Sequence, residues 1–240
     1  MPDHDFRLHP PDARLLEGRR ALVTGATTGI GQGTAFELAA HGAAVAINHR
    51  GKVGDARAMV AAIEAAGGRA VPVKMDIAIE GDVQRGFAEV REAFGGLDLL
   101  VNNAGVEKPF ELVDMPLEEW EKVISVNLTG TFLCTREAAR MMRADKNEGV
   151  IVMISSVHEV IPWERFSHYC ASKGGMKLFA QSIAKELAPH GIRVASVAPG
   201  AIKTPINQTV LDDPQERRKV EAEIPLGRWG EVSDIARAVA

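Results

Sequence analysis

Three polar side chains near the middle of the 240-residue chain have the types and the spacing needed for proton transfer: Ser156, Tyr169 and Lys173. If a helix begins near His168, Tyr169 and Lys173 lie one turn apart on the same helix face. An ammonium at that place favours the ionised phenol, so we expect it to lower the pKa of Tyr169 from an ordinary value of about 10. Ser156 lies just beyond the end of an apolar run, 150–154, and would hold the other side of a substrate oxygen. The pattern predicts a proton-transfer site, although a Tyr–Lys pair at this spacing also occurs as plain surface packing on helices.

A glycine-rich segment, residues 24–31, predicts a turn that binds phosphate. It follows a short apolar run, 19–23, that we expect to be a buried strand, and it leads into a helical pattern. Glycines let the backbone approach a pyrophosphate, and the helix N-terminus supplies unpaired N–H groups and a favourable dipole. The spacing Gly25-x3-Gly29-x-Gly31 differs from the common G-x-G-x-x-G fingerprint. A tight strand–helix turn without a ligand therefore stays an alternative.

The second predicted strand, 43–48, is followed by His49 and Arg50, where many dinucleotide sites have an Asp or Glu that binds a ribose. A guanidinium can bind a 2′-phosphate through two parallel hydrogen bonds. Arg50 therefore favours NADP, or the use of both NADP and NAD. A merely solvated Arg50 is the alternative.

Apolar strand-like runs alternate with helical patterns along the chain. The predicted strands are 19–23, 43–48, 70–75, 97–101, 149–154 and 192–197, and the predicted helices include 53–66, 80–94, 116–142, about 168–188 and one from Glu231. This alternation indicates a single doubly wound, Rossmann-like α/β domain: a parallel sheet with helices on both faces. Ligands bind beyond the carboxyl ends of the strands in such sheets. Gly25, Arg50, Asp76 and the segment 102–105 all lie at such ends.

Two segments are predicted to stand apart from this domain core. Residues 1–17 are polar and rich in Pro and Asp, so we expect an extension outside the catalytic domain, which would span 18–240. Residues 201–224 show no strong periodicity and contain Pro205 and Pro214. We expect a long loop there that acts as a substrate lid.

Asn127 lies within the apolar stripe of the predicted helix 116–142. A buried Asn in the middle of a helix is usually packed and hydrogen-bonded. The alternative is that it disturbs the helix and holds a water near the site.

Composition narrows the classes of partner. The net charge is −4 and no basic cluster is present, so no nucleic-acid partner is expected. The only cysteines, Cys134 and Cys170, stand in no CxxC or His-rich context, which argues against a metal site and fits a reducing cytoplasm. No apolar run approaches the length of about 18 residues that a membrane span needs.

Taken together, these motifs resemble those of the short-chain dehydrogenases/reductases. The matching motifs are Thr24-Gly25-x3-Gly29-Ile30-Gly31, Asp76, Asn102-Asn103-Ala104-Gly105, Asn127, Ser156, Tyr169-x3-Lys173 and Pro199-Gly200 with Thr204. The resemblance implies a nicotinamide cofactor, a small-molecule substrate, a homotetramer and a catalytic tetrad of Asn127, Ser156, Tyr169 and Lys173. It also implies that the cofactor contacts Gly25, Thr28, Gly29, Ile30, Gly31, Arg50, Asp76, Ile77, Asn103, Ala104, Gly105, Tyr169, Lys173, Pro199, Gly200, Ile202 and Thr204.

Within this family the chain is similar to a bacterial group, the glucose 1-dehydrogenases, in the segments 45–50, 102–109, 155–163, 174–177 and 199–207. That similarity implies a sugar pocket lined by Glu107, Ser156, His158, Tyr169 and Asn207. The reaction would be oxidation of the anomeric carbon of an aldose, glucose to gluconolactone. The alternatives are reduction of a ketone or 3-oxoacyl substrate on the same tetrad, and a cofactor-binding regulator without turnover.

The chain departs from that group in three places. His49 stands where a Tyr is usual and Lys203 where an Asn is usual, and either could retune the preference for cofactor or sugar. Family members also continue past the helix at Glu231 with a further strand. Because this sequence stops at Ala240, we expect that final strand to be missing.

Overall fold

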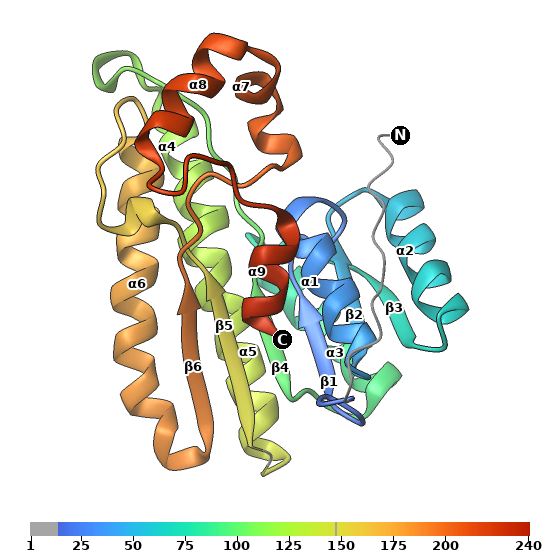
Figure 1. Cartoon of the computed structure of the whole chain (residues 1–240). Helices are drawn as coiled ribbons and strands as arrows, with labels where there is room; N and C mark the ends of the chain where they lie inside the picture. The colour runs from blue at the N-terminus through green and yellow to red at the C-terminus, as the bar shows by residue number, and fades with distance from the viewer. Residues whose placement is uncertain (1–13, 147) are drawn as a thin grey trace.

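In the computed structural model, which describes residues 14–146 and 148–240, six parallel strands form one sheet in the order β3-β2-β1-β4-β5-β6 (Figure 1). The strands are β1 (Arg20–Val23), β2 (Ala44–His49), β3 (Arg69–Lys74), β4 (Leu99–Asn102), β5 (Gly149–Ile154) and β6 (Ile192–Val197). Each lies within two residues of a strand predicted from the sequence. The strand order reverses between β1 and β4, so the predicted doubly wound fold is confirmed.

Helices cover both faces of this sheet (Figure 1). One face packs against α3 (Glu80–Phe94), α5 (Thr131–Ala144) and α6 (Ser167–Leu187), and the other against α1 (Gly29–Ala40), α2 (Val53–Ala65) and α9 (Val232–Val239). In β1, Leu22 belongs to the first core, while its neighbours Ala21 and Val23 belong to the second. Burial on both faces explains why the strands are almost continuously apolar rather than alternating.

The predicted helix 116–142 is interrupted, and the prediction of one continuous helix is wrong. α4 (Leu117–Ile124) is followed by a π-helical turn, Ser125–Gly130, and then by α5. Asn127 lies in this turn, and its backbone carbonyl accepts a hydrogen bond from the Thr131 hydroxyl at 2.7 Å. π-helical turns inside helices are frequent at functional sites. Asn127 is thus packed and hydrogen-bonded, and the helix is distorted at its position. That it holds a water near the site stays a prediction.

The predicted lid is also more ordered than a loop. After a 3₁₀ turn at Pro205–Asn207, the segment forms α7 (Gln208–Asp212) and α8 (Pro214–Glu223). α8 begins at an Asp–Pro pair, because the Asp213 carboxylate accepts hydrogen bonds from the backbone N–H groups of Gln215 at 2.8 Å and Glu216 at 3.3 Å. Both short helices lie above the carboxyl ends of the strands (Figure 1).

The segment predicted as an N-terminal extension falls largely outside the described residues, which begin at residue 14. Its last residues form a turn that lies along the end of α1, where the Leu16 N–H donates to the His41 carbonyl at 2.9 Å. Leu16 also packs against the sheet core on this face. Among the residues that the structure describes, no helix combines the length and the apolar character needed to cross a membrane.

Candidate active site

A cavity of about 1230 Å³ opens at the carboxyl ends of the strands. With two exceptions, Gly31 and Asn127, every residue predicted for catalysis, cofactor or substrate contributes to its lining. We divide the cavity into a glycine side, formed by residues 25–30, 48–52, 76–77 and 103–105, and a lid side, formed by residues 157–163 and 205–229. Tyr169 and Lys173 lie between the two.

The glycine side is shaped by backbone that tolerates no side chain. Gly25 and Gly29 have φ angles of +60° and +55°, in the left-handed region that favours glycine. A Cβ on Gly31 would lie 2.4 Å from Asn103 Nδ2 and 2.5 Å from the Gly25 carbonyl oxygen. Thr28, which precedes α1, makes no side-chain hydrogen bond to the first turn, so that helix start is left to bind an anion. These features fit a dinucleotide pyrophosphate.

Short polar side chains join the strand ends beneath this turn. The Thr24 hydroxyl accepts hydrogen bonds from the backbone N–H groups of Asn103 at 2.9 Å and Ala104 at 3.0 Å. The Asn48 carboxamide oxygen accepts from the Gly25 N–H at 2.9 Å, and its nitrogen donates to the Met75 carbonyl at 2.9 Å. β1, β2, β3 and β4 are thereby locked together, and the sequence had given Asn48 no such role.

The end of β2 carries the residues expected to select the cofactor. Arg50 is exposed and borders the cavity, as the 2′-phosphate interpretation requires. His49 beside it is buried, with its Nδ1 lacking a hydrogen-bond partner, and burial together with Lys74 lowers its pKa. The Asp76 carboxylate already accepts a hydrogen bond from the Ala78 N–H at 3.0 Å and also borders the cavity.

Tyr169 and Lys173 lie one turn apart near the start of α6, as predicted. Burial raises the pKa of Tyr169 to about 12, with the Ser156 side chain acting in the opposite direction. The prediction that Lys173 lowers this pKa is therefore wrong for the protein without its cofactor. Lys173 Nζ donates to the Ile154 carbonyl at 2.9 Å and lies 5.6 Å from the centre of the Tyr169 ring. Burial also lowers the pKa of Lys173 to about 8. The desolvation of the phenol, which depends on the tertiary packing, outweighs the effect of the nearby ammonium.

Asn127 acts through the loop after β4. Its side-chain oxygen accepts from the Val106 N–H at 2.8 Å, and its nitrogen donates to the Val106 carbonyl at 3.0 Å and to Ser172 Oγ at 3.1 Å. The residue is fully buried. Protein groups thus occupy both ends of the carboxamide, which fixes the loop bearing Glu107 against α6.

The predicted substrate residues outside the catalytic tetrad, Glu107, His158 and Asn207, differ in the hydrogen bonds that they already make. Burial raises the pKa of Glu107, and the nearby Lys173 acts against this. His158 Nδ1 lies 3.0 Å from the Ile161 carbonyl oxygen. Asn207 Nδ2 donates to the Ile202 carbonyl at 2.8 Å, so this amide nitrogen is engaged in holding the base of the lid.

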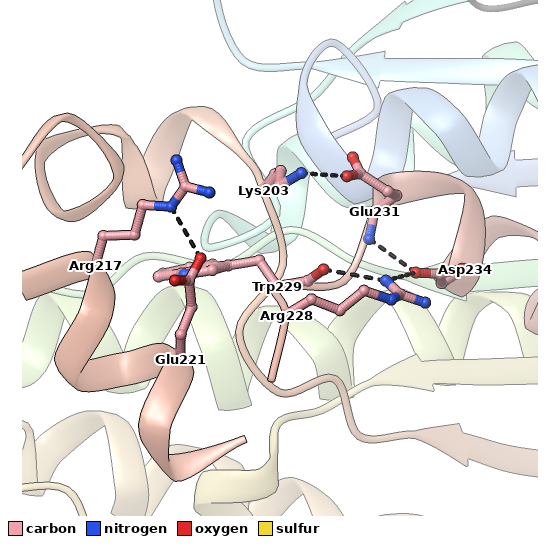
Figure 2. Close-up of polar contacts among 7 residues, drawn as sticks. All are labelled: Lys203, Arg217, Glu221, Arg228, Trp229, Glu231 and Asp234. Carbon is pink, nitrogen blue, oxygen red and sulfur yellow. Dashed lines mark hydrogen bonds and ion pairs between the residues drawn. The ribbon is translucent and has the colours of Figure 1, made fainter. Parts of the chain in front are cut away.

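The two ends of the lid meet at a short bridge. The Lys203 N–H donates to the Gly230 carbonyl at 2.9 Å, and the Gly230 N–H donates to the Ala201 carbonyl at 2.9 Å. Figure 2 shows the side chains around this bridge: Lys203 pairs with Glu231, while Arg228 reaches both the Trp229 carbonyl and Asp234. The lid is therefore tied at its base by backbone as well as by charge.

Several apolar residues of the lid line the cavity, and the sequence did not single them out as site residues. They are Ile206, Val210, Val220, Ile224, Leu226 and Trp229. Val220 lies on α8, whereas Ile224 follows the end of that helix in an extended conformation, so no single helical face unites these residues. Among residues 14–146 and 148–240, no group of three or more His, Cys, Asp or Glu side chains is arranged to hold a metal ion.

Comparison with known proteins places these features in a family. A sequence model described as short chain dehydrogenase matches residues 19–215. The chain is 42% identical to the 3beta-hydroxysteroid dehydrogenase 1 of Eggerthella lenta, covering 94% of this chain and 86% of that protein. It is 43% identical to an L-rhamnose 1-dehydrogenase (NAD(P)(+)) of a Sphingomonas species, covering 93% and 88%. The glucose 1-dehydrogenase of Gluconobacter oxydans is 42% identical, with 92% and 84% covered.

Solved structures agree with this. The crystal structure of a gluconate 5-dehydrogenase from Burkholderia cenocepacia, in complex with NADP and tartrate, superposes with a TM-score of 0.89. It is 32% identical in sequence and covers 95% of this chain and 89% of that chain.

Proposed function

The chain belongs to the short-chain dehydrogenase family, and we propose that it oxidises the anomeric carbon of an aldose, glucose to gluconolactone, with NADP favoured over NAD. The proposal of a sugar substrate rests on two hydrogen-bond acceptors beside Tyr169. The Glu107 carboxylate and the His158 ring both border the cavity. A sugar offers several hydroxyl donors to such acceptors, whereas an alcohol with a single hydroxyl uses that group up at Ser156 and Tyr169. Two of the relatives named above bear the names of sugar dehydrogenases.

The glycine side would hold the cofactor. Its pyrophosphate would lie over the segment 29–31, its adenine near Asp76 and its 2′-phosphate at Arg50. Pro199, Gly200 and Thr204 would hold the nicotinamide, and Lys173 would bind the nicotinamide ribose. A bound nicotinamide supplies the hydride acceptor.

The chain's own residues would then handle the proton. Ser156 and Tyr169 hydrogen-bond the substrate hydroxyl and orient it, and Tyr169 Oη accepts its proton. Because burial raises the pKa of the phenol to about 12, the neutral form dominates near neutral pH. Proton acceptance therefore depends on positive charge brought close to Tyr169. Lys173 supplies part of that charge, and its own lowered pKa makes this contribution pH-dependent.

Assays on the full chain can test this proposal. We would incubate the protein with glucose, rhamnose or a 3β-hydroxysteroid, each with NAD or NADP, and follow the absorbance of the reduced nicotinamide. The proposal expects the highest kcat/KM with an aldose and NADP. Turnover of the steroid alone would overturn it. Cofactor binding without turnover of any substrate would instead favour a regulator.

A second candidate substrate is a ketone or an alcohol with an apolar body. The apolar lid residues, among them Val220 and Leu226, favour it, since they present a surface that binds apolar rings. The relative from Eggerthella lenta bears the name of a steroid dehydrogenase. The same panel of substrates, run in the reductive direction with a ketone or a 3-oxoacyl compound, distinguishes the two.

The cofactor preference has its own test. Arg50→Ala should weaken NADP binding by about ten- to a hundredfold, since hydrogen bonds to a charged group contribute about 1.5–3 kcal/mol, and should leave NAD within about twofold. The Kd values follow from quenching of tryptophan fluorescence on titration with each cofactor. Equal losses for both cofactors would contradict the placement of a 2′-phosphate at Arg50. The homotetramer expected from the family is a separate proposal, which light scattering tests.

A further inference from the structure

The loop between Ser156 and Tyr169 carries a stack of three aromatic rings. Trp163 lies between His158, at 4.5 Å between ring centres, and Phe166, at 3.7 Å, and both pairs are within 12° of parallel. Tyr169 meets the edge of this stack, with ring centres 6.4 Å from His158 and 6.1 Å from Trp163. The stack therefore ends on one side at the proposed proton acceptor.

Both faces of Trp163 are covered by these neighbouring rings. A tryptophan in a sugar pocket commonly offers an open face to the substrate, but here neither face is open. Trp163 also borders the cavity. Its contribution to binding must therefore come through the residues that it holds.

The ring of His158 is fixed in its proton position as well as in its orientation. Its Nδ1 lies 3.0 Å from the Ile161 carbonyl oxygen, which can only accept a hydrogen bond. Nδ1 therefore carries the proton, and in the neutral ring Nε2 is then an acceptor. Within the described residues no protein group is bonded to Nε2.

His158 is also tied to the catalytic serine. Its backbone N–H donates to Ser156 Oγ at 3.2 Å, at the start of a one-turn helix, Val157–Glu159. This bond uses a lone pair of the hydroxyl and leaves its proton for a substrate oxygen. One backbone turn thus places the Ser156 hydroxyl and the His158 ring side by side.

Hydrogen bonds hold the backbone of the His158 turn, and ring stacking adds a contact to the His158 side chain itself. Val160 and Ile161 are 65% and 53% exposed, so they bury little surface that could anchor the turn. The chain then bends at Arg165, whose φ is +67°, and its carbonyl accepts from the Phe110 N–H at 2.8 Å. Ring stacking is the contact that spans the exposed part between these points.

We propose that Trp163 is a positioning residue that, stacked between Phe166 and His158, holds His158 Nε2 as an acceptor for a second hydroxyl of the substrate. The inference rests on the proposed function, since it needs a substrate with another hydroxyl near the reacting carbon. The His158 acceptor would favour polyhydroxy substrates over alcohols with a single hydroxyl. The apolar residues of the lid play no part in this preference. The inference places the specificity of the site in a residue whose ring faces never touch the substrate.

The first test is spectroscopic and needs no turnover. Nitrogen NMR of the full chain labelled at its histidines reports which ring nitrogen of His158 is protonated, with a His158→Gln variant to assign the signal. In the wild type we expect a single tautomer with the proton on Nδ1. Trp163→Ala should give averaged signals, and Trp163→Phe should restore the single tautomer. An unchanged signal in Trp163→Ala would overturn the inference, and circular dichroism checks that each variant is folded.

The second test is a kinetic cycle. Trp163→Ala should raise the KM for glucose about three- to tenfold with kcat within about twofold, because it removes one hydrogen bond that forms before the reaction. The double variant His158→Gln, Trp163→Ala should be no worse than His158→Gln alone, since Trp163 acts through His158. If the increase in KM of the double variant equalled the product of the increases in the two single variants, the inference would be overturned. Trp120→Ala, an exposed change on α4, is the matched control and should leave KM unchanged.

The outcomes separate this inference from the proposed function. If the wild type oxidises no aldose, the proposed function fails, and the second-hydroxyl selection fails with it, while the tautomer of His158 still decides whether Trp163 positions that ring. If aldose oxidation is intact and Trp163→Ala changes neither the tautomer nor the KM, the positioning role alone fails.

Discussion

The glycine side of the cavity is built from backbone and short buried side chains, whereas the lid side is built from half-buried, stacked rings and two short helices. On the glycine side, Thr24 and Asn48 join the strand ends through hydrogen bonds of about 2.9–3.0 Å. On the lid side, the lid is tied at Lys203 and Gly230, and His158 depends on a ring stack. We therefore expect the backbone of the glycine side to accommodate a substitution poorly. The lid side should accommodate one by small movements of its side chains and helices. The predictions below test this difference, from the largest expected effect to the smallest.

Tyr169, between the two sides, should give the largest effect. Tyr169→Phe keeps the ring and its packing but removes the proton acceptor, so we expect turnover to fall by about 10²–10⁴-fold. Cofactor affinity should stay within about threefold, because that binding depends on the glycine side. Initial rates and a fluorescence titration with NADPH measure the two quantities. Rates like those of the wild type would contradict the role of Tyr169 as proton acceptor.

The ionisation of Tyr169 can be followed directly, because it is the only tyrosine in the chain. Burial raises its pKa to about 12, so the protein without cofactor should show no phenolate absorbance below about pH 10. Since the phenolate is the base, the oxidation rate should rise with pH above pH 7, and the rise should flatten above about pH 8, where Lys173 loses the charge that supports the phenolate.

Tyr169→Phe has no tyrosine and serves as the blank for this titration, and circular dichroism marks the pH at which the protein unfolds. A phenolate signal near pH 8 without cofactor would reverse the balance: the Lys173 ammonium would then outweigh burial. That result would restore the expectation drawn from the sequence alone.

Gly31 tests the rigidity of the glycine side. In Gly31→Ala the new Cβ would lie 2.4 Å from Asn103 Nδ2 and 2.5 Å from the Gly25 carbonyl, so backbone must move. We expect a loss of about 1–3 kcal/mol in the free energy of unfolding, and NADPH binding weakened at least about tenfold. Gly54→Ala, in α2 with open space around its Cβ position, is the matched control. It should stabilise the protein by about 0.5–1 kcal/mol. Equal behaviour of both variants in urea unfolding would show that the glycine turn adapts.

The same contrast explains what could be predicted from the sequence. The strands and the glycine turn were predicted to within two residues, because each depends on local chemistry: an apolar run, a positive φ, a helix start. Tyr169 and Lys173 were placed correctly because one helical turn separates them. The pKa of Tyr169 was not predicted correctly, because the burial of the phenol depends on how the loop bearing His158 and Trp163 packs against it.

The secondary structure of the lid was predicted wrongly for a different reason. Residues 201–224 were predicted to be a loop, although Asp213-Pro214 is a local helix-start signal that was passed over. The sequence indicates the interruption at Asn127 only as one of two alternatives, because the contacts between Asn127 and Val106 that accompany it join residues 21 positions apart. The helix α8 in the lid could thus be predicted from the sequence. The π-helical turn at Asn127 could be established only from the tertiary structure.

The base of the lid should give the smallest effect. Lys203 and Glu231 are 43% and 51% exposed, and an ion pair of that kind contributes only about 0–1 kcal/mol because water and salt screen it. The backbone bonds between Lys203 and Gly230 remain in Lys203→Ala. We therefore expect a fall in Tm of less than about 4 °C and a rise in the KM for the sugar of no more than about threefold, seen only at low salt.

Lys219→Ala is the matched control, because Lys219 pairs with Glu216 within α8 and not across the base. It should leave both quantities unchanged. A tenfold or larger rise in KM for Lys203→Ala that persists in high salt would mean that side-chain charge, not backbone, holds the lid. The lid side would then be as intolerant of change as the glycine side, and the contrast between them would fail.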